Sequence, residues 1–152
     1  MPDRKTVARA RRDAREGRSP STQAGEFVRE EIEDIRQGKH GVRSTKQAIA
    51  IGLSMARRAG VKLPPPAKGK TSEKTRKSAA SAYRKGQRGE PISAKRSRAS
   101  AKALKREPRS GVSHAALSRQ ARAVARRRGV RARSASARKA AMTRSQRLRR
   151  SR

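Results

Sequence analysis

The sequence contains no cysteine and no tryptophan, and its aromatic residues are one tyrosine and one phenylalanine. Without cysteine the chain can form no disulfide, no thiol nucleophile and no Cys-containing metal site. With so few aromatic side chains it lacks the base-stacking platforms of RNA-recognition and single-strand-binding folds. No uninterrupted apolar run approaches the length of a transmembrane helix or of a signal-peptide core. We therefore expect a soluble intracellular protein with no membrane association.

Large apolar residues and acidic residues are also scarce. Leu, Ile, Val and Phe together number 18 of 152 residues, below the level of about 20% at which a packed core becomes common. The chain has 11 acidic residues against 44 Lys and Arg, which gives a formal net charge of +33. A chain that repels itself so strongly is stabilised by a polyanion, so we expect a nucleic-acid partner.

One central stretch carries a complete set of helix signals. Ser44 suits the N-cap, Gln47 completes a Ser-x-x-Gln capping box, and Gly60 suits the left-handed position after the last turn. These signals predict a helix over residues 45–59. On a helical wheel one side, opposite Arg57, is apolar. That side consists of Ala48, Ile49, Ile51, Gly52, Leu53, Met55 and Ala56. We expect it to be buried and the Arg57 side to face water or phosphate.

A second helix is predicted over residues 22–37, between N-cap candidates that begin at Ser19 and a stop at Gly38. The connection to the next helix is short enough to fold the two helices antiparallel. The apolar stripe of the 22–37 helix, which would meet the 45–59 helix, consists of Ala24, Val28, Ile32 and Ile35. The predicted fold class is therefore all-α, with a short antiparallel helical hairpin that follows a basic N-terminal segment.

The composition changes at Pro64-Pro65-Pro66, which cannot continue a helix. Residues 64–152 hold 29 Lys or Arg against three acidic residues, in Ala-rich blocks between Gly and Pro breakers. Because like charges four residues apart repel, we expect this tail to be largely disordered, or helical only when an anion neutralises it. The predicted organisation is a basic segment at 1–18, a hairpin at 19–63, a Pro-rich linker at 64–71 and a basic tail at 72–152. The predicted helical blocks of the tail are 72–85, 94–106, 114–128 and 135–149.

This charge pattern predicts sequence-nonspecific binding to nucleic acid, most simply to double-stranded DNA. Arg outnumbers Lys 31 to 13, which favours bidentate phosphate contacts and insertion into the minor groove. The candidate contacts in the hairpin are Lys46, Arg57 and Arg58. The candidate contacts in the tail are Arg96, Arg98, Arg119, Arg122, Arg126, Arg127, Arg128, Arg131, Arg133, Arg147, Arg149 and Arg150.

Other motifs in the sequence give no support for an enzymatic or metal-binding function. A Gly-Lys-Thr at residues 69–71 ends like a phosphate-binding loop, but position 64 is Pro where that loop needs Gly. His40 and His114 are isolated in the sequence, without the neighbours that a metal site or an activated nucleophile needs. The outer face of the 45–59 helix offers no dense set of base-reading residues. We therefore expect no enzymatic activity, no metal site and no cofactor.

The segment RSTKQAIAIGLS, continued by ARRAGVKLP after one residue, resembles a family of small basic bacterial proteins of unassigned function. The resemblance covers roughly residues 26–66, and it implies DNA binding by composition without supplying a catalytic or binding residue. The tail resembles, by composition, the Ala/Lys/Arg tails of linker-histone-like bacterial proteins. Together these resemblances imply a histone-like, nucleoid-associated protein of the bacterial cytoplasm.

Two alternatives stay open at this point. The chain could be a basic protein that binds RNA or associates with the ribosome. It could also be an adaptor whose hairpin recruits a protein partner, or a second copy of itself, through Ile49, Leu53 and Met55, while the tail only localises it.

Overall fold

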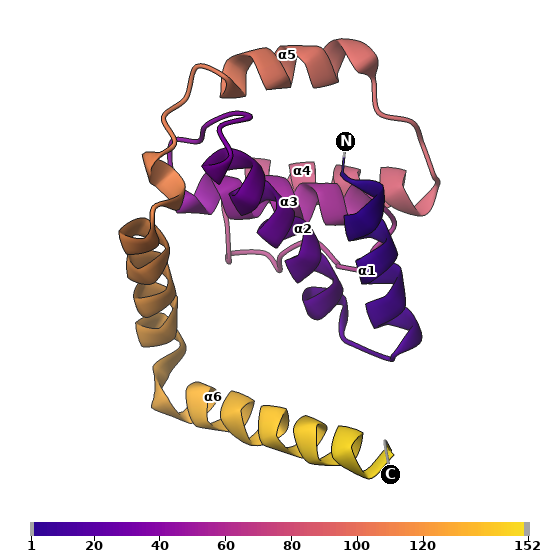
Figure 1. Cartoon of the computed structure of the whole chain (residues 1–152), viewed down its shortest axis with the longest axis vertical. Helices are drawn as coiled ribbons and strands as arrows, with labels where there is room; N and C mark the ends of the chain where they lie inside the picture. The colour runs from indigo at the N-terminus through magenta and orange to yellow at the C-terminus, as the bar shows by residue number, and fades with distance from the viewer. Residues whose placement is uncertain (1, 151–152) are drawn as a thin grey trace. The chain divides into compact units, whose positions relative to one another are not determined.

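The computed structural model describes residues 2–150, and over that range the chain is helical without any β-strand (Figure 1). The all-α prediction is confirmed. In chain order the elements are α1 (Arg4–Arg15), α2 (Pro20–Arg36), α3 (Thr45–Arg58), α4 (Glu73–Gln87), α5 (Ala94–Leu104), the 3₁₀ turn η1 (Ser110–Val112) and α6 (His114–Arg150). They form two compact units. Unit 1 ends at Ser113 and unit 2 begins at His114.

Short-range capping signals explain where these helices begin and end. Ser44 accepts a hydrogen bond from the amide of Gln47 at 3.2 Å, as predicted, while the Gln47 side chain accepts one from the amide of Arg43. At the other end of α3 the amide of Val61 donates to Ala56 O at 3.1 Å, and the amide of Gly60, which has a φ of 89°, donates to Arg57 O at 3.1 Å. This is a Schellman ending. The same pattern of two backbone bonds ends α1, α2 and α4.

Helices α2 and α3 approach each other more closely than side chains normally allow. A Cβ atom at Gly52 would lie 2.7 Å from the Cα of Val28, so the glycine is required for contact between the two backbones. The N-terminal half of α2, with Phe27, packs near Ala56 at the C-terminal end of α3, whereas Ile35 packs with Ala48. These contacts define the centre of unit 1.

Two small apolar clusters form the core of unit 1. The first contains Ala10, Ala24, Phe27, Ala56 and Val61, and therefore joins α1 to the α2–α3 pair. The second contains Ile35, Val42, Ala48 and Val112. Helix α4 packs on α3 through Ala79 and Ala82, both buried. The core thus draws on segments on both sides of the predicted 19–63 hairpin.

The segment before η1 closes unit 1 through bonds that are distant in sequence. The amide of Gly41 donates to Leu104 O at 3.0 Å, and the amide of Val42 donates to Pro108 O at 2.8 Å. The buried Thr45 hydroxyl donates to the carbonyl of Gly111 at 2.6 Å. These bonds place Val112, which is 2% exposed, in the second cluster.

The tail was expected to be largely disordered or only conditionally helical, and the disorder is not confirmed, because residues 73–87, 94–104 and 114–150 are helical. Each helix has local support that the charge argument omitted: Ser72 caps α4, Ser93 caps α5, and all three helices are rich in alanine. The predicted 72–85 block ends before Gly86, but Gly86 lies inside α4, where a Cβ would lie 1.8 Å from the carbonyl oxygen of Arg57. Gly129 does interrupt α6, with φ of 71° and ψ of 168°.

Candidate nucleic-acid interface

Helix α6 presents a high density of cationic side chains and contains no acidic residue. From Arg119 onward every Arg and Lys whose side chain the structure describes is exposed. Arg119, Arg122 and Arg126 are spaced three and four residues apart and therefore share one face. Around the rest of the helix lie the predicted contacts Arg127, Arg128, Arg131, Arg133 and Arg149 and also Arg138, Lys139 and Arg144, which the sequence interpretation did not include. The side chains of Arg147 and Arg150 lie outside the described residues.

Helix α5 also presents exposed cationic side chains, but it is shorter. None of its residues is buried, and Lys95, Arg98 and Lys102 form one stripe along it, with Arg96 beside them. No ion pair involves any Lys or Arg of α5 or α6 whose side chain is described. These helices therefore carry charge that no acid within the described structure neutralises.

The three cations predicted in α3 have different environments. Lys46 is exposed, as expected. Arg57 is not a surface residue: it is 7% exposed and its guanidinium donates to Leu63 O at 3.1 Å and to Pro64 O at 3.3 Å. Arg58 is half-buried and donates to the carbonyls of Glu90 and Pro91. Arg57 and Arg58 therefore anchor the chain segments after α3 and α4, and the expectation that Arg57 faces phosphate was wrong.

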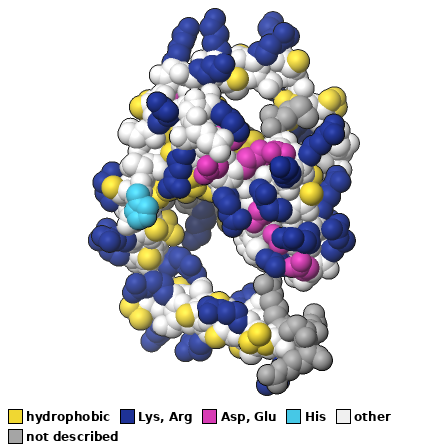
Figure 2. All heavy atoms as spheres, in the orientation of Figure 1, with side chains coloured by type: hydrophobic (Ala, Val, Ile, Leu, Met, Phe, Trp, Pro, Cys, Tyr) yellow, Lys and Arg dark blue, Asp and Glu magenta, His cyan; other side chains and the backbone are white. Residues whose placement is uncertain are grey.

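Two acidic side chains of α2 make contacts with α1 or with its N-cap residue. Glu26, whose side chain is 12% exposed, pairs with Arg9 at 2.7 Å and with Arg29 at 3.1 Å. Glu30 accepts a hydrogen bond from the amide of Asp3 at 2.6 Å. Figure 2 shows the acidic side chains gathered within part of the visible face, whereas Lys and Arg are spread over it. None of the described ion pairs joins an acid of α2 to the basic tail.

Glu31 and His40 form a pair that the sequence did not predict. Glu31 is 3% exposed, and its Oε1 lies 3.6 Å from His40 Nε2 without a hydrogen-bond partner in the described structure. Burial raises the pKa of Glu31 to about 7, with smaller contributions from His40, which lowers it, and from Asp34 and Glu30, which raise it. The expectation that His40 lacks a carboxylate neighbour was therefore wrong.

The apolar residues considered as a partner surface are partly used within the fold. Leu53 and Met55 pack on the first core cluster, and both are half-buried. Ile49 is half-buried as well. Among the described residues no group of three His, Cys, Asp or Glu side chains is placed to hold a metal ion. None of the described helices combines the length and apolar character needed to span a membrane.

Comparison with known proteins bears on the N-terminal part of the chain. Residues 4–68 match the model of a family of unknown function, DUF6496. The DUF6496 match begins at the start of α1, well before the segment that carries the resemblance in the sequence, and this agrees with the packing of α1 on α2. It ends before α4, so α5 and α6 lie outside it. The comparisons found no match among curated proteins and none among solved structures.

Proposed function

We propose that this protein binds double-stranded DNA without sequence selectivity, as a histone-like, nucleoid-associated protein of the bacterial cytoplasm. The observation that carries the proposal is the separation of charge along the chain. All 11 acidic residues precede Pro108, while α5 and α6 expose cations that no acid in the described structure pairs with. Such surfaces attract the closely spaced phosphates of a duplex and release its counterions.

The residue types favour backbone contacts over base readout. Arg predominates in α6, and its planar guanidinium forms bidentate bonds with phosphate. Sequence-specific readers place a few defined side chains against base edges, whereas the cations of α6 point to many sides of the helix. Tyr83 and Phe27 are the only aromatic residues, and Phe27 is fully buried, so stacking on unpaired bases contributes little. The DUF6496-like segment would then serve as a folded base for these basic helices.

The first prediction concerns the salt dependence of binding. Titration of a duplex with the whole chain should give a slope of log K against log salt concentration of about −5 or steeper, since each neutralised phosphate contributes about −0.9. The variant Arg119→Gln/Arg122→Gln/Arg126→Gln should make the slope shallower by about 2 to 3. The matched control is Arg4→Gln/Arg11→Gln/Arg15→Gln, which removes three exposed, unpaired cations of α1 and should change the slope by less than about 1.

Three outcomes would contradict this proposal. Equal effects of the two triple variants would mean that α6 is not the binding surface. A preference of more than about 1000-fold for one duplex over its scrambled version would indicate a specific reader. An RNA duplex of equal length that binds more than about tenfold tighter would favour the RNA-binding alternative.

A further inference from the structure

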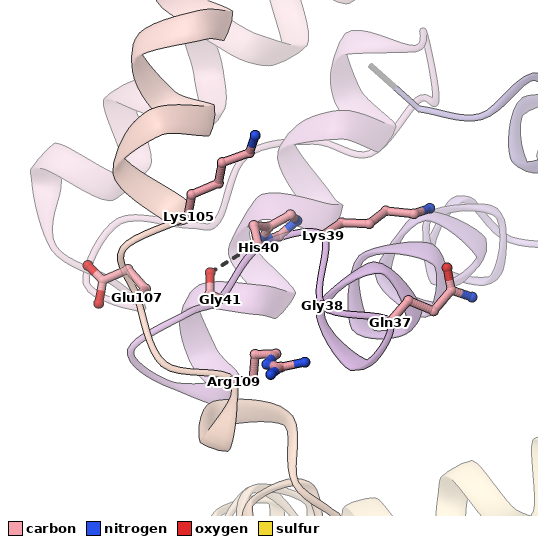
Figure 3. A pocket seen from close by; sticks show the side chains of 8 residues that line it. All are labelled: Gln37, Gly38, Lys39, His40, Gly41, Lys105, Glu107 and Arg109. Atoms are coloured by element: carbon pink, nitrogen blue, oxygen red, sulfur yellow. Dashed lines mark hydrogen bonds between the residues drawn. The ribbon is translucent and has the colours of Figure 1, made fainter.

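A polar pocket lies in unit 1 where the loop after α2 meets the segment that follows α5. Its volume is about 560 Å³, within the range of about 300 to 1,000 Å³ that is common for ligand sites. It is lined by Gln37, Gly38, Lys39, His40, Gly41, Lys105, Glu107 and Arg109 (Figure 3). Two backbone bonds hold these segments together, from Gly41 to Leu104 and from Val42 to Pro108. The pocket is therefore part of the folded unit.

The charges in the lining do not cancel. Lys39 is paired with Asp34 at 2.5 Å, and Glu107 is paired with Arg43 at 3.0 Å. Lys105 and Arg109 form no ion pair with any acid that the structure describes. In Figure 3 the side chains of Glu107 and Arg109 leave their segment in opposite directions. Two cations without a counterion therefore line the same opening, together with the imidazole of His40.

Gly38 leaves room for the Arg109 guanidinium. A Cβ atom at position 38 would lie 2.7 Å from Nη1 of Arg109, and Gly38 itself has a φ of 81°, which favours glycine. His40 Nδ1 is hydrogen-bonded to Gly41 O at 3.2 Å, and its Nε2 lies 3.6 Å from Oε1 of Glu31. Cationic side chains without an acidic partner are the groups that bind phosphate oxygens.

We propose that this pocket binds a phosphate-containing anion, with Arg109 on one side of His40 and Lys105 on the other. Arg109 would supply paired N–H donors, and Lys105 a point charge. The phosphate could belong to a small soluble anion or to the backbone of a nucleic acid. The proposal does not rest on DNA binding by α5 and α6, because its residues lie outside both helices.

The test follows the full chain by NMR while inorganic pyrophosphate is added. In the wild type the NMR signals of the Gly41 amide and the His40 imidazole should shift as pyrophosphate is added and then reach a plateau. In Lys105→Gln/Arg109→Gln the apparent affinity reported by these signals should fall at least about tenfold, as expected for the loss of hydrogen bonds to a charged group. The matched control, Lys95→Gln/Arg98→Gln, removes the same charge from α5 and should titrate like the wild type. An unchanged Val112 methyl signal in both variants would show that unit 1 remains folded.

A second titration with a short DNA duplex identifies the source of the phosphate. If the duplex shifts Gly41 in the same direction and pyrophosphate competes with it, the pocket takes a backbone phosphate. If Gly41 still titrates with pyrophosphate in the presence of saturating duplex, the pocket takes a small anion. The proposal is overturned if Gly41 responds to neither probe, or if both double variants lose the response equally. In either case Arg109 would serve only to offset the partial negative charge at the C-terminal end of α2.

Discussion

Glu31 occupies a position on α2 where the helical pattern would place an apolar side chain. With Ala24, Phe27 and Ile35 it makes up the buried residues of α2. Its carboxyl group has one close basic neighbour, His40, and two acidic ones, Asp34 and Glu30. In this buried environment, next to two acidic side chains, the protonated carboxyl group is favoured over the carboxylate.

This position gives a prediction about pH. Because burial raises the pKa of Glu31 from its ordinary value of 4.5 to about 7, the folded state binds more protons than the unfolded state between these two values. Its contribution to the free energy of unfolding should therefore fall as pH rises from about 4.5 to 7 and stay low above that. Glu31→Gln should remove this loss, so that urea denaturation shows the variant gaining stability relative to the wild type at pH 8 but not at pH 4.5.

The control for this experiment is Glu33→Gln, a residue on the exposed side of the same helix. It should shift the stability of the protein equally at both pH values. A constant difference between Glu31→Gln and the wild type from pH 4.5 to 8 would mean that the Glu31 carboxyl group is ionised in the folded state throughout.

Arg57 shows why the sequence placed one cation on the wrong kind of surface. Arg57 lies on the polar side of α3, but its guanidinium reaches the carbonyls of Leu63 and Pro64, where the following chain crosses the helix. A helical wheel describes one helix and cannot include a segment that returns over it. Burial lowers the pKa of Arg57, and the two carbonyl acceptors are what make its burial possible.

At the scale of elements, two glycines within helices have opposite roles. Gly52 on α3 lies against the backbone of Val28, whereas a Cβ atom at Gly25 on α2 would meet nothing within 4 Å. Gly52→Ala should destabilise unit 1 by about 1 to 3 kcal/mol, since an added methyl group overpacks the contact. Gly25→Ala should stabilise it by about 0.5 to 1 kcal/mol through higher helix propensity. Thermal denaturation of both variants measures the difference, and equal effects would contradict the close α2–α3 contact.

The helix ends were largely predictable, because they depend on local residues. Ser44 and Gly60 gave α3 within one residue, and Ser19 and Gly38 gave α2 within two at its start and one at its end. Gly86 misled the interpretation, since the same residue type serves both as a stop and as a site of close approach. Which role applies depends on Arg57, a residue distant in sequence.

The part of α6 that follows Gly129 should be locally less stable than α3. Beyond Gly129 every α6 side chain that the structure describes is exposed, including Val130 at 68% and Leu148 at 68%. A helix without buried contacts is supported only by its own hydrogen bonds. Hydrogen exchange should therefore be faster for the amides of residues 130–146 than for those of 48–56, and saturating DNA should slow it. Equal protection in the free protein would indicate contacts that stabilise this part of α6.

At the scale of the whole molecule, charge and packing are assigned to different parts of the chain. The described core is confined to unit 1, where the acidic residues also lie. Unit 2 has cations and no acid. The sequence made this separation visible, but it could not show how far the folded unit extends. That extent is set by hydrogen bonds between segments about 65 residues apart, such as the bond from Thr45 to Gly111. Because closing a loop of this length depends on residues that are distant in sequence, no local sequence pattern predicts it.

The last prediction tests that extent. Val112 is 2% exposed and packs with Ile35, Val42 and Ala48, whereas Val130 is 68% exposed. Val112→Ala should lower the free energy of unfolding of unit 1 by about 1 to 3 kcal/mol, by loss of buried methyl groups and creation of a small cavity. Val130→Ala makes the same chemical change on α6 and should leave unit 1 within about 0.5 kcal/mol.

Neither valine variant changes the charge of the chain, so both should bind a duplex with affinities within about threefold of the wild type. If Val112→Ala had no effect on unfolding, the segment before α6 would not belong to the folded unit, and α5 would be held at one end only. A large loss of DNA affinity in Val112→Ala would instead show that α5 must be fixed at both ends to bind.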